Sequence, residues 1–414
     1  MLKNIFKRTN KVINDQEQND TMKEVTNMSE KHFERNSATK NEFRKVGDSM
    51  LNDIFEATNN TLNYVMKENT HMEDKLLEQG YEALHEGYYA TAMDIFTHLA
   101  DIGIPEAQYA LGVMYEKGYG TRKDNAISSM WYERAAEQGH PKAQYTLGNM
   151  YQNGFGIEKN EAKSLAWYER AAAQGYPPAQ YTLGYMYYKG IGTERDVAKA
   201  FSWFERAAAN EEMNAQYSLG DMYYYGNFVE MDKEKAFSWF QRAAKGGHAR
   251  SQHRLADMYF HEGKTEEEKA KSIEWYERAA KQGYQRAQVK LADVYYYFAH
   301  SMSKALTWYE RAAEKGDAKA QFSTACMYYT GKGTEVDMRR AYFWLERAAR
   351  NDHAEAQRWL GRMYERGDFV EKDEATALEW YDIAAAKGNK IAKYRAEILR
   401  YNLEYGHGET DVVA

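Results

Sequence analysis

Apolar residues recur along most of the chain with the spacing of helix faces, in two alternating blocks. In one block, Ala143, Leu147, Met150 and Tyr151 stand at i, i+4, i+7 and i+8, which places them on one side of a helix. The second block repeats this helical spacing at Ala200, Trp203, Phe204, Ala207 and Ala208. Polar residues and glycines separate the blocks, so the pattern predicts pairs of amphipathic helices.

The two blocks form a unit that recurs along the chain. Residues 143–156 read AQYTLGNMYQNGFG, and residues 179–192 read AQYTLGYMYYKGIG, 36 residues further on. The residue that opens each copy is found at Ala107, Ala143, Ala179, Ala215, Ser251, Ala287, Ala320, Ala356 and Ala392. Eight of the nine tryptophans share one column: Trp131, Trp167, Trp203, Trp239, Trp275, Trp308, Trp344 and Trp380. Such regularity indicates a repeat protein.

Proline and glycine mark the ends of the predicted helices. Pro105, Pro141 and Pro177 share a column that suits the first helical position. Glycines follow the second helix at Gly139, Gly175, Gly283 and Gly316, and paired glycines lie between the helices at 118/120, 154/156, 190/192 and 331/333. One hairpin cannot bury both of its apolar stripes, so neighbours must stack. The predicted fold is all-α, a right-handed α-solenoid of stacked helix-turn-helix repeats.

Small residues in the first helix predict how closely the helices pack. Gly112, Gly148, Gly184 and Gly220, with the alanine pairs of the second helix, allow a close approach, and we expect tryptophan to fill the gaps. On this interpretation, replacing Trp203 by alanine costs about 3–5 kcal/mol.

The units resemble Sel1-like repeats, which are relatives of the tetratricopeptide repeat with a longer loop between the helices. The resemblance rests on the Ala, Leu-Gly, Tyr, Gly-x-Gly, Trp-Tyr and Ala-Ala positions together, over residues 107 to about 405. Two stretches depart from the pattern. The unit at 287–319 lacks the paired glycines, and residues 76–106 look more like a plain tetratricopeptide hairpin.

These features predict the organisation of the chain. Residues 1–50 are a polar, disordered segment; 51–75 are helical with heptad-like spacing; and 76–106 form the N-terminal hairpin. The eight repeats cover 107–142, 143–178, 179–214, 215–250, 251–286, 287–319, 320–355 and 356–391. A capping helix at 392–405 and a disordered tail at 406–414 follow. The heptad-like helix packs on the first hairpin or lies free, or it self-associates through residues 51–76.

Composition narrows the setting and the partners. A net charge of −7 and a pI near 6.0 give no general attraction to nucleic acid or anionic lipid. The one cysteine, Cys326, excludes disulfides within the chain and fits a reducing compartment. No apolar run has the length of a signal peptide or a membrane span. We expect a soluble, cytoplasmic protein; membrane recruitment through a basic helix at residues 1–13 is an alternative.

Catalytic and metal-binding patterns are sparse, so the sequence predicts a non-enzymatic protein without cofactor or metal. The strings from Ser301 to Lys304 and from Ser37 to Lys40 match the SxxK pattern of penicillin-recognising enzymes but lack the companion motifs. They leave a hydrolase or penicillin-binding activity as an alternative function. We interpret Cys326 as a buried or half-buried structural thiol. The recurring Glu-Arg pairs, such as Glu169-Arg170, predict a solvated or hairpin-bridging polar stripe.

Positions that differ between the copies are candidates for ligand contact. In tetratricopeptide relatives the first helices line a concave groove, and three columns of each helix face the ligand. The resemblance carries these columns to Tyr181, Tyr185, Tyr188, Tyr217, Asp221, Tyr224, His253, Asp257, Phe260, Asp293, Tyr296, Phe322 and Tyr329. Three consecutive Asp among aromatic rings predict an acidic groove that binds a basic peptide. The alternative is that these Asp are solvated and the rings pack between units.

The favoured function is therefore a scaffold or adaptor that binds a protein or peptide, since an extended solenoid surface needs no reactive residues to bind a partner.

Overall fold

The computed structural model describes residues 71–263 and 265–406. The polar segment 1–50, the heptad-like segment 51–75 except for its last residues, the Ser37–Lys40 string and nearly all of the tail 406–414 lie outside these residues. All of the described chain is helix or loop, and no strand occurs in it. The chain divides into two compact units, one that ends at Lys123 and one that begins at Asp124.

The first unit contains a helix over residues 71–85, α4 (Tyr89–Asp101) and α5 (Pro105–Lys117). Phe96 of α4 is completely buried, and a Cβ at Gly80 would lie 2.7 Å from its ring. The Tyr81 ring also contacts Phe96, with centroids 5.1 Å apart. A glycine at position 80 therefore lets the first helix lie directly on the aromatic core of this unit.

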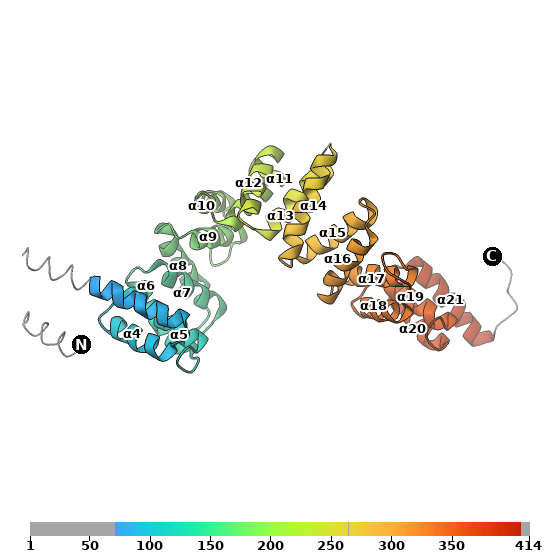
Figure 1. The fold of residues 1–414 in the computed structure, drawn as a ribbon, viewed down its shortest axis with the longest axis horizontal. Coiled ribbons are helices and arrows are strands. Elements are labelled where there is room, and N and C mark those ends of the chain that lie inside the picture. Colours follow the sequence, from blue (N-terminus) through green and yellow to red (C-terminus); the bar gives the residue numbers. More distant parts are fainter. Residues whose placement is uncertain (1–70, 264, 407–414) are drawn as a thin grey trace, which may run out of the picture. The chain divides into compact units, whose positions relative to one another are not determined.

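The second unit contains the remaining helices, and Figure 1 shows them following one another in sequence order, each packed against the next. They are α6 (Asn125–Glu137), α7 (Pro141–Asn153), α8 (Glu161–Ala173), α9 (Pro177–Lys189), α10 (Val197–Ala209), α11 (Met213–Tyr225), α12 (Lys233–Lys245), α13 (Ala249–Glu262), α14 (Glu266–Lys281), α15 (Gln285–Tyr297), α16 (Met302–Glu314), α17 (Ala318–Thr330), α18 (Met338–Arg350), α19 (Ala354–Arg366), α20 (Glu374–Ala386) and α21 (Lys390–Tyr405). We call α7, α9, α11, α13, α15, α17 and α19 the first helices of their hairpins. The helix after each of them, and also α6, is called a second helix.

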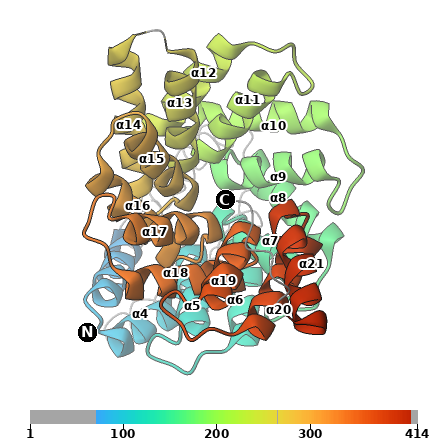
Figure 2. The same ribbon diagram turned by 90° about the vertical axis from the view of Figure 1, so that its right-hand side faces the viewer.

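The hairpins stack through a shared core. One cluster of buried residues runs without interruption from Ala256 in α13 to Met363 in α19. Figure 2 shows two of these hairpins, α17 with α18 and α19 with α20, as neighbouring pairs of helices. The predicted α-solenoid of helical hairpins is thereby confirmed.

The helix ends follow from the residues that the sequence singled out. Pro141 and Pro177 are the first residues of α7 and α9, where the missing N–H has no helical partner to lose. Most second helices begin after an Asp or Asn whose side chain accepts hydrogen bonds from the first-turn backbone; these caps are Asp124, Asn160, Asp196, Asp232, Asp337 and Asp373. The glycine columns adopt positive φ, as at Gly154 (73°) and Gly175 (83°).

In most hairpins the most deeply buried ring is not the tryptophan but the aromatic residue after it; the exception is the hairpin in which Leu345 follows a buried Trp344. Phe204 and Phe240 are 3% and 0% exposed, whereas Trp203 remains partly exposed beside the neighbouring core. A Cβ at Gly220 would lie 2.6 Å from the Phe240 ring, so the Leu-Gly glycine makes room for this ring. The close approach predicted from the glycines is confirmed. Trp203 packs, partly buried, against the core cluster that contains Ala171 and Leu183 of the preceding helices, as expected of a gap-filling residue, but Phe204 is the more deeply buried ring.

The second glycine of the inter-helix loop also permits a close contact. A Cβ at Gly156 would lie 2.1 Å from the carbonyl oxygen of Asn125, because the loop rests on the start of the previous second helix. In two loops a phenylalanine takes this place with positive φ, Phe228 (73°) and Phe369 (69°). The Phe228 ring packs against Phe201, with centroids 5.6 Å apart, which offsets part of the backbone strain.

A buried glutamine joins each hairpin to the helix before it. This column is Gln108, Gln144, Gln180, Gln216, Gln252, Gln288, Gln321 and Gln357. Each Nε2 donates to the carbonyl of an alanine eight residues earlier, over 2.9–3.3 Å. In four copies the Oε1 accepts a hydrogen bond from Gln174, Asn210, Gln282 or Asn351 at the end of the following second helix.

In two of the other copies, Gln288 and Gln357, the Oε1 atom is buried without a second hydrogen bond in the described part of the chain. For Gln288, the residue that would donate this second bond is Lys315, at the end of the following second helix. Its amine donates to the carbonyl of Gly283 instead. For Gln357, the corresponding residue is Lys387, whose amine donates to the carbonyl and the carboxylate of Asp352.

Candidate functional site

The candidate site lies on five consecutive first helices, α9, α11, α13, α15 and α17, and its three predicted columns differ in depth. The columns stand two residues before, two residues after and five residues after the Leu of the Leu-Gly pair, as at 181, 185 and 188 around Leu183. The column before the Leu packs inward. Tyr217 lies against Phe240 with ring centroids 5.7 Å apart, and His253 is 9% exposed and lies 5.6 Å from Tyr276. The other candidates of this column are also half-buried against neighbouring rings: Tyr181 and Phe322. These side chains chiefly support the packing between helices.

Two of the three consecutive aspartates accept hydrogen bonds from the second helix of their own hairpin. The hydroxyl of Tyr276 donates to Asp257 Oδ1 over 2.5 Å, and that of Tyr309 donates to Asp293 Oδ1 over 2.5 Å. Burial, reinforced by the facing carboxylates, raises the pKa of Tyr276 and of Tyr309 well above the ordinary tyrosine value. Lys319 also donates to Asp293 Oδ2 over 2.7 Å.

The remaining aspartate, Asp221, is held by an arginine of the next hairpin. Arg254 lies 3.4 Å from Asp221 Oδ1. Burial nevertheless raises the pKa of Asp221, while Arg254 opposes that shift. Asp257 in turn lies 3.5 Å from the ring of His253. Each of the three carboxylates therefore has a charged or hydroxyl group of the chain nearby, although the buried Asp221 Oδ1 makes no hydrogen bond within the described residues. These contacts weaken the electrostatic reason for expecting a cationic ligand, and the basic partner stays a prediction.

The third column is a row of half-buried aromatic rings: Tyr188, Tyr224, Phe260, Tyr296 and Tyr329. Cations of the chain itself cover several of them. The Arg254 guanidinium lies 5.7 Å from the centre of the Tyr224 ring, and the Lys332 amine lies 5.1 Å from that of Tyr296. Lys332 also donates to the Tyr296 hydroxyl over 2.7 Å. These internal contacts occupy ring faces that a basic ligand would otherwise use.

Several exposed side chains of the first helices lie on positions that the three columns do not include. The second residue of the helix and the residue four positions later are basic in neighbouring copies: Arg250, Arg254, Arg286, Lys290 and Lys319. The exposed tyrosines of the first helices are Tyr225 (53%) and Tyr297 (62%), which also lie outside the columns, and Tyr185 (41%) of α9, which belongs to the second column. The recurrence of basic residues in successive copies was a signal that the sequence offered. It was missed because the columns were carried over from tetratricopeptide relatives.

The Glu-Arg pairs connect neighbouring hairpins. Tyr187 of α9 donates to Glu169 of α8 over 3.0 Å, and Tyr295 of α15 donates to Glu277 of α14 over 2.6 Å. The predicted hairpin-bridging stripe is confirmed for these glutamates. The arginines lie over the tryptophan three residues earlier, as in Arg206 over Trp203 at 4.7 Å. They shield the exposed part of the indole.

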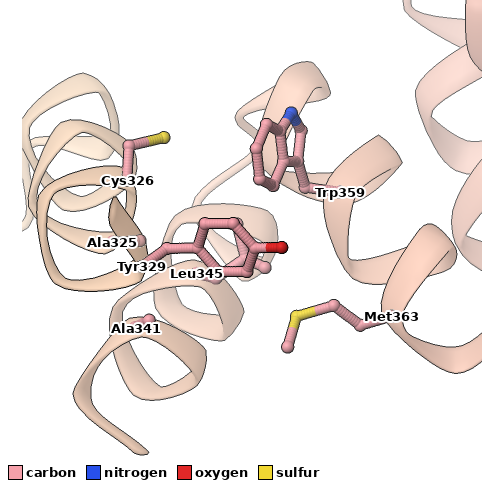
Figure 3. Close-up of a pocket in the computed structure, with 7 residues that line it drawn as sticks. All are labelled: Ala325, Cys326, Tyr329, Ala341, Leu345, Trp359 and Met363. Atoms are coloured by element: carbon pink, nitrogen blue, oxygen red, sulfur yellow. The ribbon is translucent and has the colours of Figure 1, made fainter. Parts of the chain in front are cut away.

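Cys326 lines a small apolar cavity between α17, α18 and α19. Figure 3 shows the side chains around it, which are Ala325, Cys326, Tyr329, Ala341, Leu345, Trp359 and Met363. The cavity has a volume of about 10 Å³, which is too small for a ligand. Burial raises the pKa of the Cys326 thiol to about 11, so the thiol stays protonated at neutral pH, consistent with a structural role.

The SxxK string at residues 301–304 lies at the start of α16. Ser301 is the N-cap residue, and the Lys304 amine lies 5.2 Å from the centre of the Tyr295 ring. Within residues 71–263 and 265–406, the two side chains form no hydrogen bond with each other, and no group of three or more His, Cys, Asp or Glu could hold a metal ion. Among these residues no helix is long and apolar enough to cross a membrane.

The repeat pattern can be compared with known families. The sequence profile of the Sel1 repeat matches residues 105–140, 141–176, 177–211, 214–248, 249–284, 285–317, 318–353 and 354–389. The chain belongs to the Sel1 repeat family. Its matched segments follow the helical hairpins closely, since most begin at the first residue of a first helix.

Two solved structures of Sel1 repeat proteins resemble this one. A protective antigen of uropathogenic Escherichia coli strains, described as displaying an SLR fold, is 29% identical, with a TM-score of 0.61, and the match covers 83% of this chain and 81% of that one. A Sel1 repeat protein from Oxalobacter formigenes is 31% identical, with a TM-score of 0.55, and the match covers 74% of this chain and 90% of that one. No curated protein matches the chain.

Proposed function

We propose that this Sel1 repeat protein is a protein-interaction scaffold that binds a peptide or protein segment along the first helices from α9 to α17. The observation that carries the proposal is the row of exposed aromatic side chains on these helices, at Tyr185, Tyr225 and Tyr297. Tyrosine is a rigid, amphipathic side chain that is enriched where proteins bind one another. Sel1 solenoids commonly serve as interaction scaffolds, which fits this arrangement.

The candidate residues divide into two roles in this proposal. Exposed side chains such as Tyr185 contact the partner. The half-buried rings and the hydrogen-bonded aspartates, such as Asp257 and Asp293, hold the surface in shape from below. A rigid surface loses less conformational entropy on binding, and this favours affinity. We also place the protein in the cytoplasm, because its single cysteine suits a reducing compartment.

Site-specific photo-crosslinking in the source cells tests the proposal. A benzophenone amino acid replaces Tyr297 on the proposed face, and a matched variant carries it at Met130, which is 55% exposed on the second helix α6. We expect a discrete protein to be trapped from position 297 and not from position 130. Replacing Tyr185 and Tyr225 by alanine should reduce that product.

The controls make the result decisive. Replacing Phe343 and Ile383, which are 48% and 42% exposed on second helices, by alanine removes similar exposed apolar area elsewhere. This control should leave the trapped product unchanged. The proposal fails if positions 297 and 130 trap the same proteins, or if both pairs of alanine substitutions reduce trapping equally.

A further inference from the structure

The open charges on α13, α15 and α17 have one sign. Arg250, Arg286, Lys290 and Lys319 are exposed, and Arg254 is partly exposed beside them. Three of the five, Arg250, Arg286 and Lys290, form no hydrogen bond or ion pair with any described residue. Unpaired cations on three consecutive hairpins form a patch that we call the basic patch, defined by these five residues.

The acidic residues of the same helices do not cancel this patch at the surface. Asp257 and Asp293 accept hydrogen bonds from tyrosine hydroxyls beneath the face. Glu262 is paired with Lys233 over 2.7 Å. Burial holds the pKa of His253 below its ordinary value. Its imidazole is therefore uncharged at neutral pH and does not contribute to the charge of the patch.

Helix stability does not account for the patch. Arg250, Arg286 and Lys319 are each the second residue of their helix, and no acidic residue stands in the first turn of α13, α15 or α17. The N-terminal end of a helix carries partial positive charge, so a cation there is unfavourable for the helix. Clusters of unpaired cations at such positions are typical of surfaces that bind anions.

We infer that the partner segment is acidic: an Asp- and Glu-rich stretch of a protein that crosses α13, α15 and α17, with its carboxylates on the basic patch and its apolar side chains against Tyr225 and Tyr297. Two of the three unpaired cations are arginines, which bind carboxylates in a bidentate geometry. This inference rests on the proposed scaffold function and reverses the charge of the partner that the sequence alone suggested.

A protein segment fits the patch better than nucleic acid does. Two of the five cations, Arg254 and Lys319, are already paired with Asp221 and Asp293, which leaves three unpaired cations. Association with nucleic acid depends on neutralising many successive phosphates. A short acidic segment needs only a few ion pairs, together with contacts to the tyrosines.

Fluorescence anisotropy with the full-length protein tests this inference. The probes are labelled peptides of about ten residues, the same in length and apolar content, in which the polar positions are all Glu, all Gln or all Lys, and a single-stranded oligo-dT of similar length. We expect the Glu peptide to bind at least about tenfold more tightly than the Gln and Lys peptides, and its binding to weaken with added salt.

Matched variants locate the binding. Arg250→Gln, Arg286→Gln and Lys290→Gln together remove the three unpaired cations and break no hydrogen bond or ion pair of the described residues. The control combines Lys245→Gln, Arg339→Gln and Lys393→Gln, which removes three equally exposed charges from α12, α18 and α21. The first variant should weaken binding of the Glu peptide about tenfold, and the control should bind as the unaltered protein does.

Each contrary outcome overturns the inference. It fails if the Glu peptide binds no better than the Gln peptide, if both variants weaken binding equally, or if oligo-dT binds more tightly than the Glu peptide. The scaffold proposal survives these outcomes provided that crosslinking at Tyr297 still traps a partner. If crosslinking also shows no dependence on position, both proposals fail.

Discussion

The column of buried glutamines allows a prediction with an internal control. Gln180 makes two buried hydrogen bonds: Nε2 donates to Ala172 O over 3.2 Å, and Oε1 accepts from Asn210 over 3.1 Å. Gln288, in the same column, makes only the first, to Ala280 O over 3.1 Å, and its Oε1 is buried without a partner. We therefore expect the substitutions Gln180→Leu and Gln288→Leu to differ in cost, although both replace a buried glutamine by a side chain of similar size.

The difference follows from the hydrogen bonds. Gln180→Leu removes two bonds worth about 1 kcal/mol each, so it should destabilise the protein by about 2 kcal/mol. The penalty is not larger because Asn210 keeps a second bond, to Arg206 O. Gln288→Leu loses one bond and also removes an unpaired buried acceptor that costs about 1–3 kcal/mol. Its net effect should lie near zero or be stabilising.

The assay must resolve single hairpins, because long repeat arrays do not unfold in one cooperative step. Amide hydrogen exchange followed by mass spectrometry reports local opening free energies for α8 and α9 in the first variant, and for α14 and α15 in the second. Protection should fall around Gln180→Leu and stay unchanged around Gln288→Leu. Equal losses in the two variants would refute the reasoning, since they would show that volume and shape, not hydrogen bonding, govern the column.

The remaining predictions concern the core, acid stability and the cysteine. Phe204→Ala should destabilise the protein by about 3–5 kcal/mol, whereas Trp203→Ala should cost about 2 kcal/mol or less, because part of the indole is exposed; urea unfolding followed by circular dichroism tests the order, and a larger loss at Trp203 would contradict it. Burial keeps the pKa of His253 below its ordinary value despite the nearby Asp257, so its contribution to stability is complete above about pH 6.5 and is lost as the pH falls. His253→Phe should reduce the loss of stability between about pH 7 and pH 5, and an unchanged pH profile would exclude this role. The Cys326 thiol, with its pKa raised to about 11, should react with iodoacetamide at pH 8 on the order of a hundredfold more slowly than an exposed cysteine; rapid labelling of the folded protein would contradict its burial.

The fold could be predicted from the sequence because the repeat samples each position many times. A single Pro141 is ambiguous, but a proline column, a glycine column and a tryptophan column together define where helices begin, end and pack. The centre of the core was harder to predict. Trp203 and Phe204 are adjacent and both apolar, and a periodicity of 3.6 residues does not distinguish the inner from the outer of two neighbouring positions on a helix face.

The candidate face was less predictable, since it depends on contacts between hairpins. Asp257 and Asp293 read as unpaired charges in the sequence, because the tyrosines that bond them stand 16 to 19 residues away on another helix. The glutamine column was visible as an identical residue in eight copies, but its role required the position of the alanine carbonyl eight residues earlier. Sequence periodicity places residues on a face; it does not show which side chains satisfy one another.

The glutamine column has a consequence for how such a protein changes in length during evolution. Each copy brings its own amide group and also supplies the alanine carbonyl that the next copy needs. A gene duplication that inserts one whole unit therefore leaves every donor with an acceptor on both sides of the insertion. Gain or loss of partial units would break this succession, so we expect natural variants of the array to differ by complete hairpins.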